Sequence, residues 1–220
     1  MKKTLFVLLL FLVSNCTSTH LVESWKNPDI DSYVPTKVLV VGLTTNIEAK
    51  QKFEDRLKEE FIMRGAEAYT SFDIFNPSFK TKKLTESELI ALESELIEDG
   101  FDTILFSKVV GSDDKIAYTK NFDVYDETFI KFKEDYMRYQ DIFYNPDYYE
   151  EYTVYYAETS MFCICPTKDR ELLWKGSINI VDPQSINRTV KDYITLIIEV
   201  LESENLVDPI NLGAGKSIVH

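Results

Sequence analysis

The histidines limit the kinds of catalysis that this chain can perform. There are only two, His20 near the N-terminus and His220 at the last position. Both lie outside the patterned part of the sequence, so neither is expected inside a folded core. A Ser-His-Asp or Cys-His nucleophile and a histidine-rich zinc site are therefore excluded, because each needs an imidazole held by neighbouring side chains.

Two glycine-containing segments invite comparison with phosphate-binding loops. Gly213-Ala-Gly-Lys-Ser217 looks like the end of a Walker loop, but that pattern requires a glycine at the position of Ile210. Gly42 follows a short apolar run, yet the glycines that would complete a dinucleotide fingerprint are missing. We therefore expect no nucleotide and no other cofactor.

Cys163 and Cys165 stand two apart in a segment with strand character, so both side chains should point to one face. A metal site would need two further soft ligands, which the chain does not offer, so no metal is expected. A disulfide at this spacing would be strained in an extended strand. We expect buried, reduced thiols, with an oxidised pair as the alternative in an oxidising compartment.

Paired carboxylates could perform acid-base chemistry or bind calcium. Asp113 and Asp114 are such a pair, but their spacing fits no calcium loop. In a chain with 37 acidic residues we expect this pair in a solvated turn. We accordingly expect a protein that is not an enzyme.

The N-terminus has the three parts of a signal peptide. Lys2 and Lys3 precede an apolar run over residues 5–13, which is well short of the roughly 20 residues of a membrane-spanning helix. Ser14 and Asn15 then lead to Cys16, and this ending resembles the bacterial lipobox, although most lipoboxes have Gly, Ala or Ser in place of Asn. The resemblance implies a signal peptide over 1–15, lipidation of Cys16, including palmitate, and attachment to a membrane. The alternative is an ordinary signal peptide that contains a cysteine.

Loss of the leader makes the chain more acidic. The count of basic residues falls from 24 to 22 when Lys2 and Lys3 are removed, against 37 acidic residues, which leaves a formal charge of −15. Such a surface repels nucleic acid, so no nucleic-acid partner is expected.

The hydrophobic pattern predicts one α/β domain over residues 37–207, with α+β as the alternative class and a lipid-anchored tether over 16–36. Strands are expected at 37–42, 66–72 and 101–110, separated by a helix that ends at Gly65 and by one that opens with a Thr85 to Glu88 capping box. This β-α-β-α-β order favours a mixed sheet. A β-hairpin over 153–165 and 172–180 and a last helix complete the domain; this helix is expected to start at Asp182-Pro183 and to carry an apolar face from Ile186 to Leu201. Residues 208–220 form a tail.

Residues 111–150 interrupt this pattern, and we interpret them as a tyrosine-rich insertion with limited order. Ten of the chain's 13 tyrosines fall between Tyr118 and Tyr156. Tyrosine is enriched at protein interfaces, so we expect Tyr136, Tyr139, Tyr148 and Tyr149 to contact a partner protein. The alternative is that these rings pack a hairpin extension onto the sheet.

The segment from Thr159 through Leu172-Leu-Trp-Lys-Gly-Ser177 and Val181-Asp-Pro183 to the closing helix resembles the C-terminal half of small envelope lipoproteins of unknown function. Residues 37–110 are similar in layout to periplasmic domains of the curli-secretion lipoprotein and of the Tol-system propeller protein. These resemblances imply a non-enzymatic lipoprotein of the cell envelope that binds another envelope protein. The absence of an acidic residue right after Cys16 favours the outer membrane, facing the periplasm. The alternative function is a periplasmic domain that binds a small ligand or hydrolyses it with carboxylates.

Overall fold

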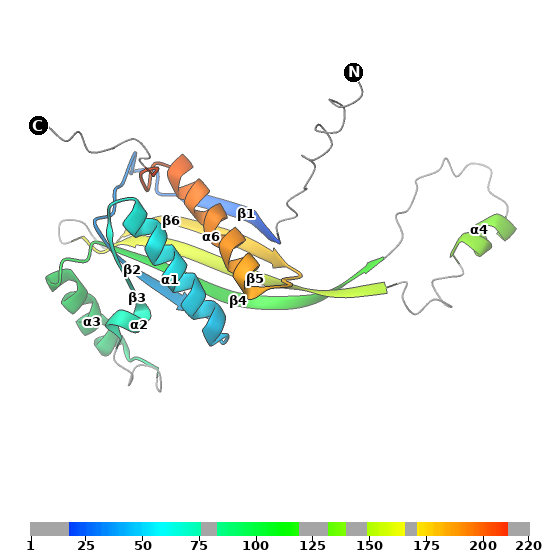
Figure 1. Cartoon of the computed structure of the whole chain (residues 1–220), viewed down its shortest axis with the longest axis horizontal. Coiled ribbons are helices and arrows are strands. Elements are labelled where there is room, and N and C mark those ends of the chain that lie inside the picture. Colours follow the sequence, from blue (N-terminus) through cyan, green and yellow to red (C-terminus); the bar gives the residue numbers. More distant parts are fainter. Residues whose placement is uncertain (1–17, 76–82, 119–131, 140–148, 166–170, 211–220) are drawn as a thin grey trace, which may run out of the picture.

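One six-stranded mixed sheet forms the centre of the molecule in this computed structural model (Figure 1). The structure describes residues 18–75, 83–118, 132–139, 149–165 and 171–210. The strands are β1 (Thr19–Lys26), β2 (Lys37–Leu43), β3 (Glu67–Thr70), β4 (Thr103–Tyr118), β5 (Tyr149–Cys163) and β6 (Glu171–Val181). Their order across the sheet is β1-β6-β5-β4-β2-β3; β2 runs parallel to β3 and β4, and the remaining neighbours are antiparallel. The predicted α/β fold with a mixed sheet is confirmed.

Helices lie on both faces of this sheet (Figure 1). α1 (Ile47–Met63) and α6 (Ile186–Ser203) cover one face, and α3 (Glu86–Glu98) packs on the other. α2 (Ser71–Ile74) directly follows β3, and α4 (Phe132–Tyr139) lies away from the sheet (Figure 1). The side chain of Asn46 caps α1 by accepting from the Ala49 amide, and the predicted capping box of Thr85 and Glu88 opens α3. Gly65 and Gly100 have positive φ angles just beyond α1 and α3, a conformation that glycine adopts without steric cost.

Successive residues of β2 enter two different hydrophobic cores. Val38 and Val40 belong to the larger core beneath α1 and α6, whereas Leu39 belongs to a smaller core that includes Leu92 and Leu96 of α3. Alternate side chains of a strand point to opposite faces, so β2 is buried on both sides, which its unbroken apolar run predicts. Ile62 near the end of α1 is 50% exposed and Leu89 near the start of α3 is 54% exposed, so neither belongs to these two cores.

The sheet begins earlier in the chain than the sequence pattern predicts. Residues 19–26 fall within the expected tether, but they form β1, which pairs antiparallel with β6 at the sheet edge. Most of its side chains are exposed, so the strand is held largely by backbone hydrogen bonds and shows little hydrophobic alternation. Trp174 of β6 adds a side-chain link, because its indole nitrogen donates to Ser24 Oγ at 2.9 Å.

The inner strands also continue beyond their expected ends. β4 runs on to Tyr118 and β5 starts at Tyr149, so both ends of the expected insertion are β-structure. A register shift between Val109 and Gly111 marks a β-bulge, and this bulge breaks the hydrophobic alternation on which the expected boundary depends. Where β6 no longer pairs with β5, residues 114–118 and 149–153 continue as a two-stranded arm, which extends away from the sheet (Figure 1).

Three charged side chains form a row on the sheet face opposite α1 and α6. Glu158 of β5 lies 2.6 Å from the ammonium groups of both Lys108 on β4 and Lys175 on β6. These hydrogen bonds, that of Lys108 first, lower the pKa of Glu158 below its ordinary value. Such a cross-strand row ties three neighbouring strands together.

Candidate functional site

A pocket opens at the end of the sheet where β2 finishes. It has a volume of about 850 Å³, within the range of roughly 300–1,000 Å³ that small-molecule sites occupy. It lies between the N-terminal parts of α1 and α6, over β4 and β5, as its lining residues show. Ligands of open α/β sheets bind beyond the carboxyl ends of parallel strands, and β2 and β4 are parallel here.

The described lining of this pocket is mainly apolar. Its aliphatic and aromatic members are Leu43, Ala49, Phe53, Val109, Val110, Tyr155, Ala157, Ile180, Pro183, Ile186, Val190 and Tyr193. Asn46, Lys50, Lys108 and several hydroxyl-bearing residues also line it, but no Asp or Glu belongs to the lining that the structure describes. An apolar enclosure with a few polar groups favours an apolar ligand with a small polar part.

Three hydroxyl groups form a network at the floor of the pocket. The Tyr193 hydroxyl lies 2.8 Å from Thr159 Oγ1 and 3.2 Å from Ser107 Oγ, and Thr159 donates to Ser107 at 2.9 Å. Burial raises the pKa of Tyr193, so its hydroxyl stays protonated at neutral pH. Tyr193 and Ser107 line the pocket, where they can exchange hydrogen bonds with a ligand.

A buried carboxylate supports the pocket from behind its wall. Glu54 of α1 is fully buried and accepts from the Gly42 amide at 2.8 Å and from the Ser71 amide and hydroxyl at 2.9 Å. Burial raises the pKa of Glu54, against hydrogen bonds and the nearby Lys50 ammonium that lower it. Glu54 thus binds the end of β2, which carries the lining residue Gly42, to the start of α2.

Sequence reasoning missed Glu54 and the hydroxyl network. The sequence does contain one indication that Glu54 is buried: it stands beside Phe53 and three residues before Leu57, on the buried face of α1. A charged residue inside an apolar helical stripe needs hydrogen-bonding partners, and its position could have identified it. Nothing in the sequence joins Ser107, Thr159 and Tyr193, which come from three separate elements.

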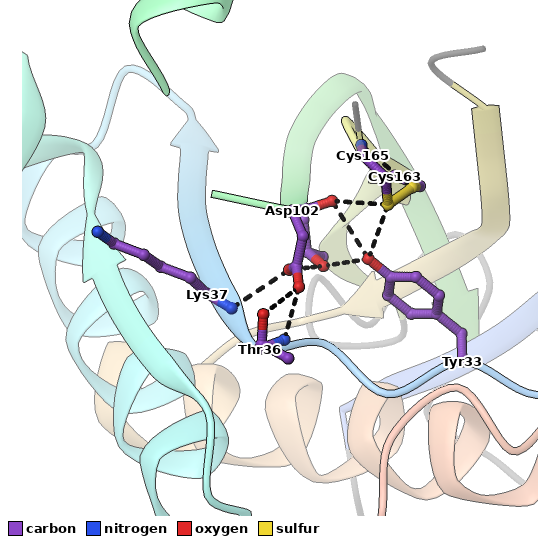
Figure 2. The surroundings of a disulfide bond; sticks show 7 residues. Tyr33, Thr36, Lys37, Asp102, Cys163 and Cys165 are labelled. Atoms are coloured by element: carbon purple, nitrogen blue, oxygen red, sulfur yellow. Dashed lines mark hydrogen bonds between the residues drawn. A yellow bond between two sulfur atoms is a disulfide. The ribbon is translucent and has the colours of Figure 1, made fainter. Parts of the chain in front are cut away.

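The second site is a disulfide at the other end of β5. Cys163 and Cys165 are joined, so our expectation of reduced thiols is wrong and the oxidised alternative holds (Figure 2). β5 ends at Cys163, so Cys165 lies outside the strand, and the argument from strain in an extended strand does not apply. Cys163 is buried with 1% of its area exposed, whereas Cys165 is partly exposed.

Hydrogen bonds hold the chain segments around this disulfide (Figure 2). The Tyr33 hydroxyl lies 2.8 Å from Thr103 Oγ1 and 3.7 Å from Cys165 Sγ, and it donates to the Asp102 carbonyl at 3.2 Å. Burial raises the pKa of Tyr33 to about 12. The Asp102 carboxylate accepts hydrogen bonds from the amides of Thr36 and Lys37 and from the hydroxyl groups of Thr36 and Thr103. Both of its oxygens therefore have hydrogen-bond donors.

Asp113 and Asp114 are expected in a solvated turn, but they lie in β4 near the base of the arm. The Asp113 carboxylate accepts from Tyr156 at 2.9 Å, and that hydrogen bond with the one from Lys115 lowers its pKa. Asp114 accepts from Thr153 across the strand pair at 2.8 Å. Consecutive strand residues point to opposite faces, so the two carboxylates lie on opposite faces of β4. Each accepts a hydrogen bond from a side chain of β5.

Of the tyrosines expected to contact a partner, Tyr136 is described in full. It is 52% exposed on α4, and its ring lies 5.8 Å from that of Phe132, which is 83% exposed. The side chains of Tyr139 and Tyr149 lie outside the described residues, as does the whole of Tyr148. Tyr136 thus belongs to an exposed aromatic surface.

Other predicted features are also outside the described residues, namely Cys16 with the leader and the glycines of residues 213–217. Among the residues that the structure does describe, no helix is long and apolar enough to cross a membrane. Within the same residues, no group of three His, Cys, Asp or Glu is arranged to hold a metal ion.

No protein-family model matches the chain, and no curated protein matches it. Similar solved structures include a PelC dodecamer from Paraburkholderia phytofirmans, with 8% identity, a TM-score of 0.40, and coverage of 86% of this chain and 98% of that one. A variant of that PelC has 10% identity and a TM-score of 0.38 over 86% and 96% of the two chains. Lipoprotein GNA1162 from Neisseria meningitidis has 13% identity and a TM-score of 0.40 over 77% and 99%. Similarity at this level tells nothing about what the chain binds.

Proposed function

We propose that this protein is a lipid-anchored component of the bacterial cell envelope that binds another envelope protein through the arm and α4. The observation that carries the proposal is the exposure of large apolar side chains there. Phe132 is 83% exposed, Ile116 63%, Met137 56% and Tyr136 52%. Aromatic residues and methionine are enriched in protein interfaces, and an isolated two-stranded hairpin is only marginally stable without further contacts.

The charges near the arm define the chemistry of the partner. Asp114, Glu150 and Glu151 are all exposed on or beside its strands, with Lys115 as a nearby base. The chain as a whole carries a net charge of −13 before any leader is removed. A partner with a basic rim around an apolar centre would complement this surface and would be steered toward it.

The anchor in this proposal is lipid on Cys16. Thr17 and Ser18 alone would separate that cysteine from β1, in place of the expected tether over 16–36. Three residue steps span at most about 10 Å, so the domain would lie close to the membrane surface. More than one acyl chain is needed for stable attachment, and an acylated N-terminal cysteine supplies them. We place the protein on the periplasmic side of the outer membrane.

Crosslinking and affinity capture from intact envelopes test the protein-binding proposal. The test variant is Phe132→Ser with Tyr136→Ser, and the matched control is Leu89→Ser with Ile90→Ser, which removes apolar side chains that are 54% and 49% exposed on α3. We expect the test variant to lose a partner that the native chain and the control both retain. Equal capture by all three chains would show that α4 is not the binding surface.

The lipid anchor is tested separately with Cys16→Ala. Metabolic labelling with a palmitate analogue should mark the native chain, and the variant should remain unlabelled and leave the membrane fraction. Retention of the partner by this variant at lower yield would show that the lipid only concentrates the protein. A native chain without label would refute the anchor and leave the arm proposal standing.

A second candidate function is the binding of an apolar small molecule, and the pocket favours it. The described lining lacks Asp and Glu, so the geometry supports binding better than carboxylate-dependent hydrolysis. Ala49→Trp would fill the pocket from α1, and Ala91→Trp on the exposed side of α3 is its control. A fluorescent fatty acid should bind the native chain and the control but not Ala49→Trp. Equal binding to all three would exclude the pocket.

A further inference from the structure

The two sulfurs of the disulfide differ in their access to solvent. Cys163 Sγ belongs to a residue that is 1% exposed and lies in the larger core, whereas Cys165 is partly exposed at the start of the segment that follows β5. An attacking thiolate must approach a disulfide sulfur directly, so access selects which sulfur reacts. We propose that Cys163 and Cys165 form a thiol–disulfide exchange site that accepts electrons from a dithiol of another protein, with Cys165 as the attacked sulfur.

The first step replaces one sulfur–sulfur bond with another. A thiolate of the partner attacks Cys165 Sγ, the bond between the two cysteine sulfurs breaks, and the electron pair stays on Cys163 Sγ as a thiolate. The Cys165 amide donates a hydrogen bond to Cys163 Sγ at 3.2 Å, so a donor is already in place for the charge that forms there. Hydrogen bonds to the charged form of a group stabilise it, which makes Cys163 a good leaving group although it is buried.

The second step releases the partner. Its other thiolate attacks its own sulfur in the mixed disulfide, and Cys165 leaves as a thiolate. The partner dithiol has then lost two electrons and two protons, and the two cysteines of this chain have gained both. A more oxidising disulfide, either glutathione disulfide or that of an envelope oxidoreductase, restores the bond by the reverse exchange.

The surroundings keep the two cysteines close when the bond is open. Cys163 pairs with Thr103 across the strands, and the Ile164 amide donates to the Asp102 carbonyl at 2.9 Å. The Tyr33 hydroxyl lies 3.7 Å from Cys165 Sγ, and its hydrogen bond to the Asp102 carbonyl does not depend on the bond between the two sulfurs. Reduction therefore leaves the backbone of β4 and β5 paired, and the oxidised form can be restored without refolding.

The compartment of the partner rests on the proposed function, which includes export to the envelope. The exchange chemistry itself can be measured on the purified chain. The mature full-length chain with Cys16→Ala is treated with dithiothreitol under native conditions, and free thiols are counted by alkylation and mass spectrometry. We expect complete reduction with an unchanged circular dichroism spectrum, followed by reoxidation with glutathione disulfide. Reduction that requires denaturant would overturn the proposal, since the disulfide would then be structural only.

Single-cysteine variants test which sulfur reacts. Cys163→Ala leaves Cys165 free, and Cys165→Ala leaves Cys163 free, both in the Cys16→Ala chain. Glutathione disulfide should form a mixed disulfide with Cys165 at least about a hundredfold faster than with Cys163, because a buried thiol reacts only after local opening. Thermal unfolding shows whether each variant is folded. Equal rates in folded variants would refute Cys165 as the attacked sulfur, whether or not the lipid anchor is found.

Discussion

Replacement of Glu54 tests whether its buried carboxylate holds the end of β2 in place. Both oxygens face donors only: Oε1 accepts from the Gly42 amide at 2.8 Å, and Oε2 accepts from the Ser71 amide at 2.9 Å. In Glu54→Gln one oxygen becomes an NH2 group, which cannot accept from either amide. One buried N–H group therefore loses its partner, and the Ser71 hydroxyl can rotate to limit the damage.

The expected loss of stability follows from the number of orphaned donors. A buried donor left without a partner costs about 1–3 kcal/mol, so Glu54→Gln should lower the free energy of unfolding by about 1–3 kcal/mol at neutral pH. Glu54→Ala orphans both amides and should cost about 3–5 kcal/mol. The control Glu59→Gln, on the exposed side of the same helix, should change stability by less than about 0.5 kcal/mol.

Urea unfolding followed by circular dichroism measures these differences, and its pH dependence supplies a second check. The pKa of Glu54 is raised above 4.5 in the folded protein, so the folded state binds its proton more tightly than the unfolded state. The stabilising contribution of this proton is full below pH 4.5 and is lost as pH rises through the folded-state pKa. The stability of the native chain relative to Glu54→Gln should fall across that window. Equal stability of Glu54→Gln and Glu59→Gln would refute the reasoning.

Three further predictions concern the sheet and the pocket floor. Gly176→Ala should lower the free energy of unfolding by about 1–3 kcal/mol in urea, because a Cβ there would lie 2.4 Å from the Trp174 ring; Gly111→Ala, where the nearest atom is 3.9 Å away, should not. Tyr193→Phe should cost about 1 kcal/mol, since the two other hydroxyls still bond to each other, and it should weaken the binding of a fluorescent fatty acid, because the pocket lining loses a hydrogen-bonding group. Glu158→Gln should cost no more than about 1 kcal/mol at neutral pH, because the carboxylate is partly exposed. The pKa of Glu158 is lowered, so the stabilisation from its ionised carboxylate is present above pH 4.5 and is lost as pH falls through the folded-state pKa. The free energies of unfolding of the native chain and the variant should therefore become equal in acid.

The exposed aromatic surface is predicted in part by the sequence. The clustering of tyrosines predicts exposed rings, and Tyr136 is exposed on α4. The same clustering does not show that β4 and β5 extend beyond the sheet as a two-stranded arm. Exposed strands of this kind are held by backbone hydrogen bonds, which leave no hydrophobic period in the sequence.

The sequence by itself determined the elements that bury a regular apolar pattern. The β-branched run of β2, the helical stripe of α6 and the capping box at Thr85 are all recognisable, because each depends on residues that are near one another in the chain. The residue count likewise limits the chain to two imidazole groups, those of His20 and His220.

Only the tertiary structure decided the positions of β1, the pocket and the disulfide. Residues 19–26 form a strand because their backbone pairs with the edge of β6, and their own side chains show little hydrophobic alternation. The pocket joins residues from α1, α6 and four strands, and the partners of Glu54 come from the end of β2 and the start of α2. Whether two cysteines two apart can bond depends on where the strand ends, which is set by pairing with β4 and β6. These features arise from contacts between distant parts of the chain, so local sequence patterns contain no record of them.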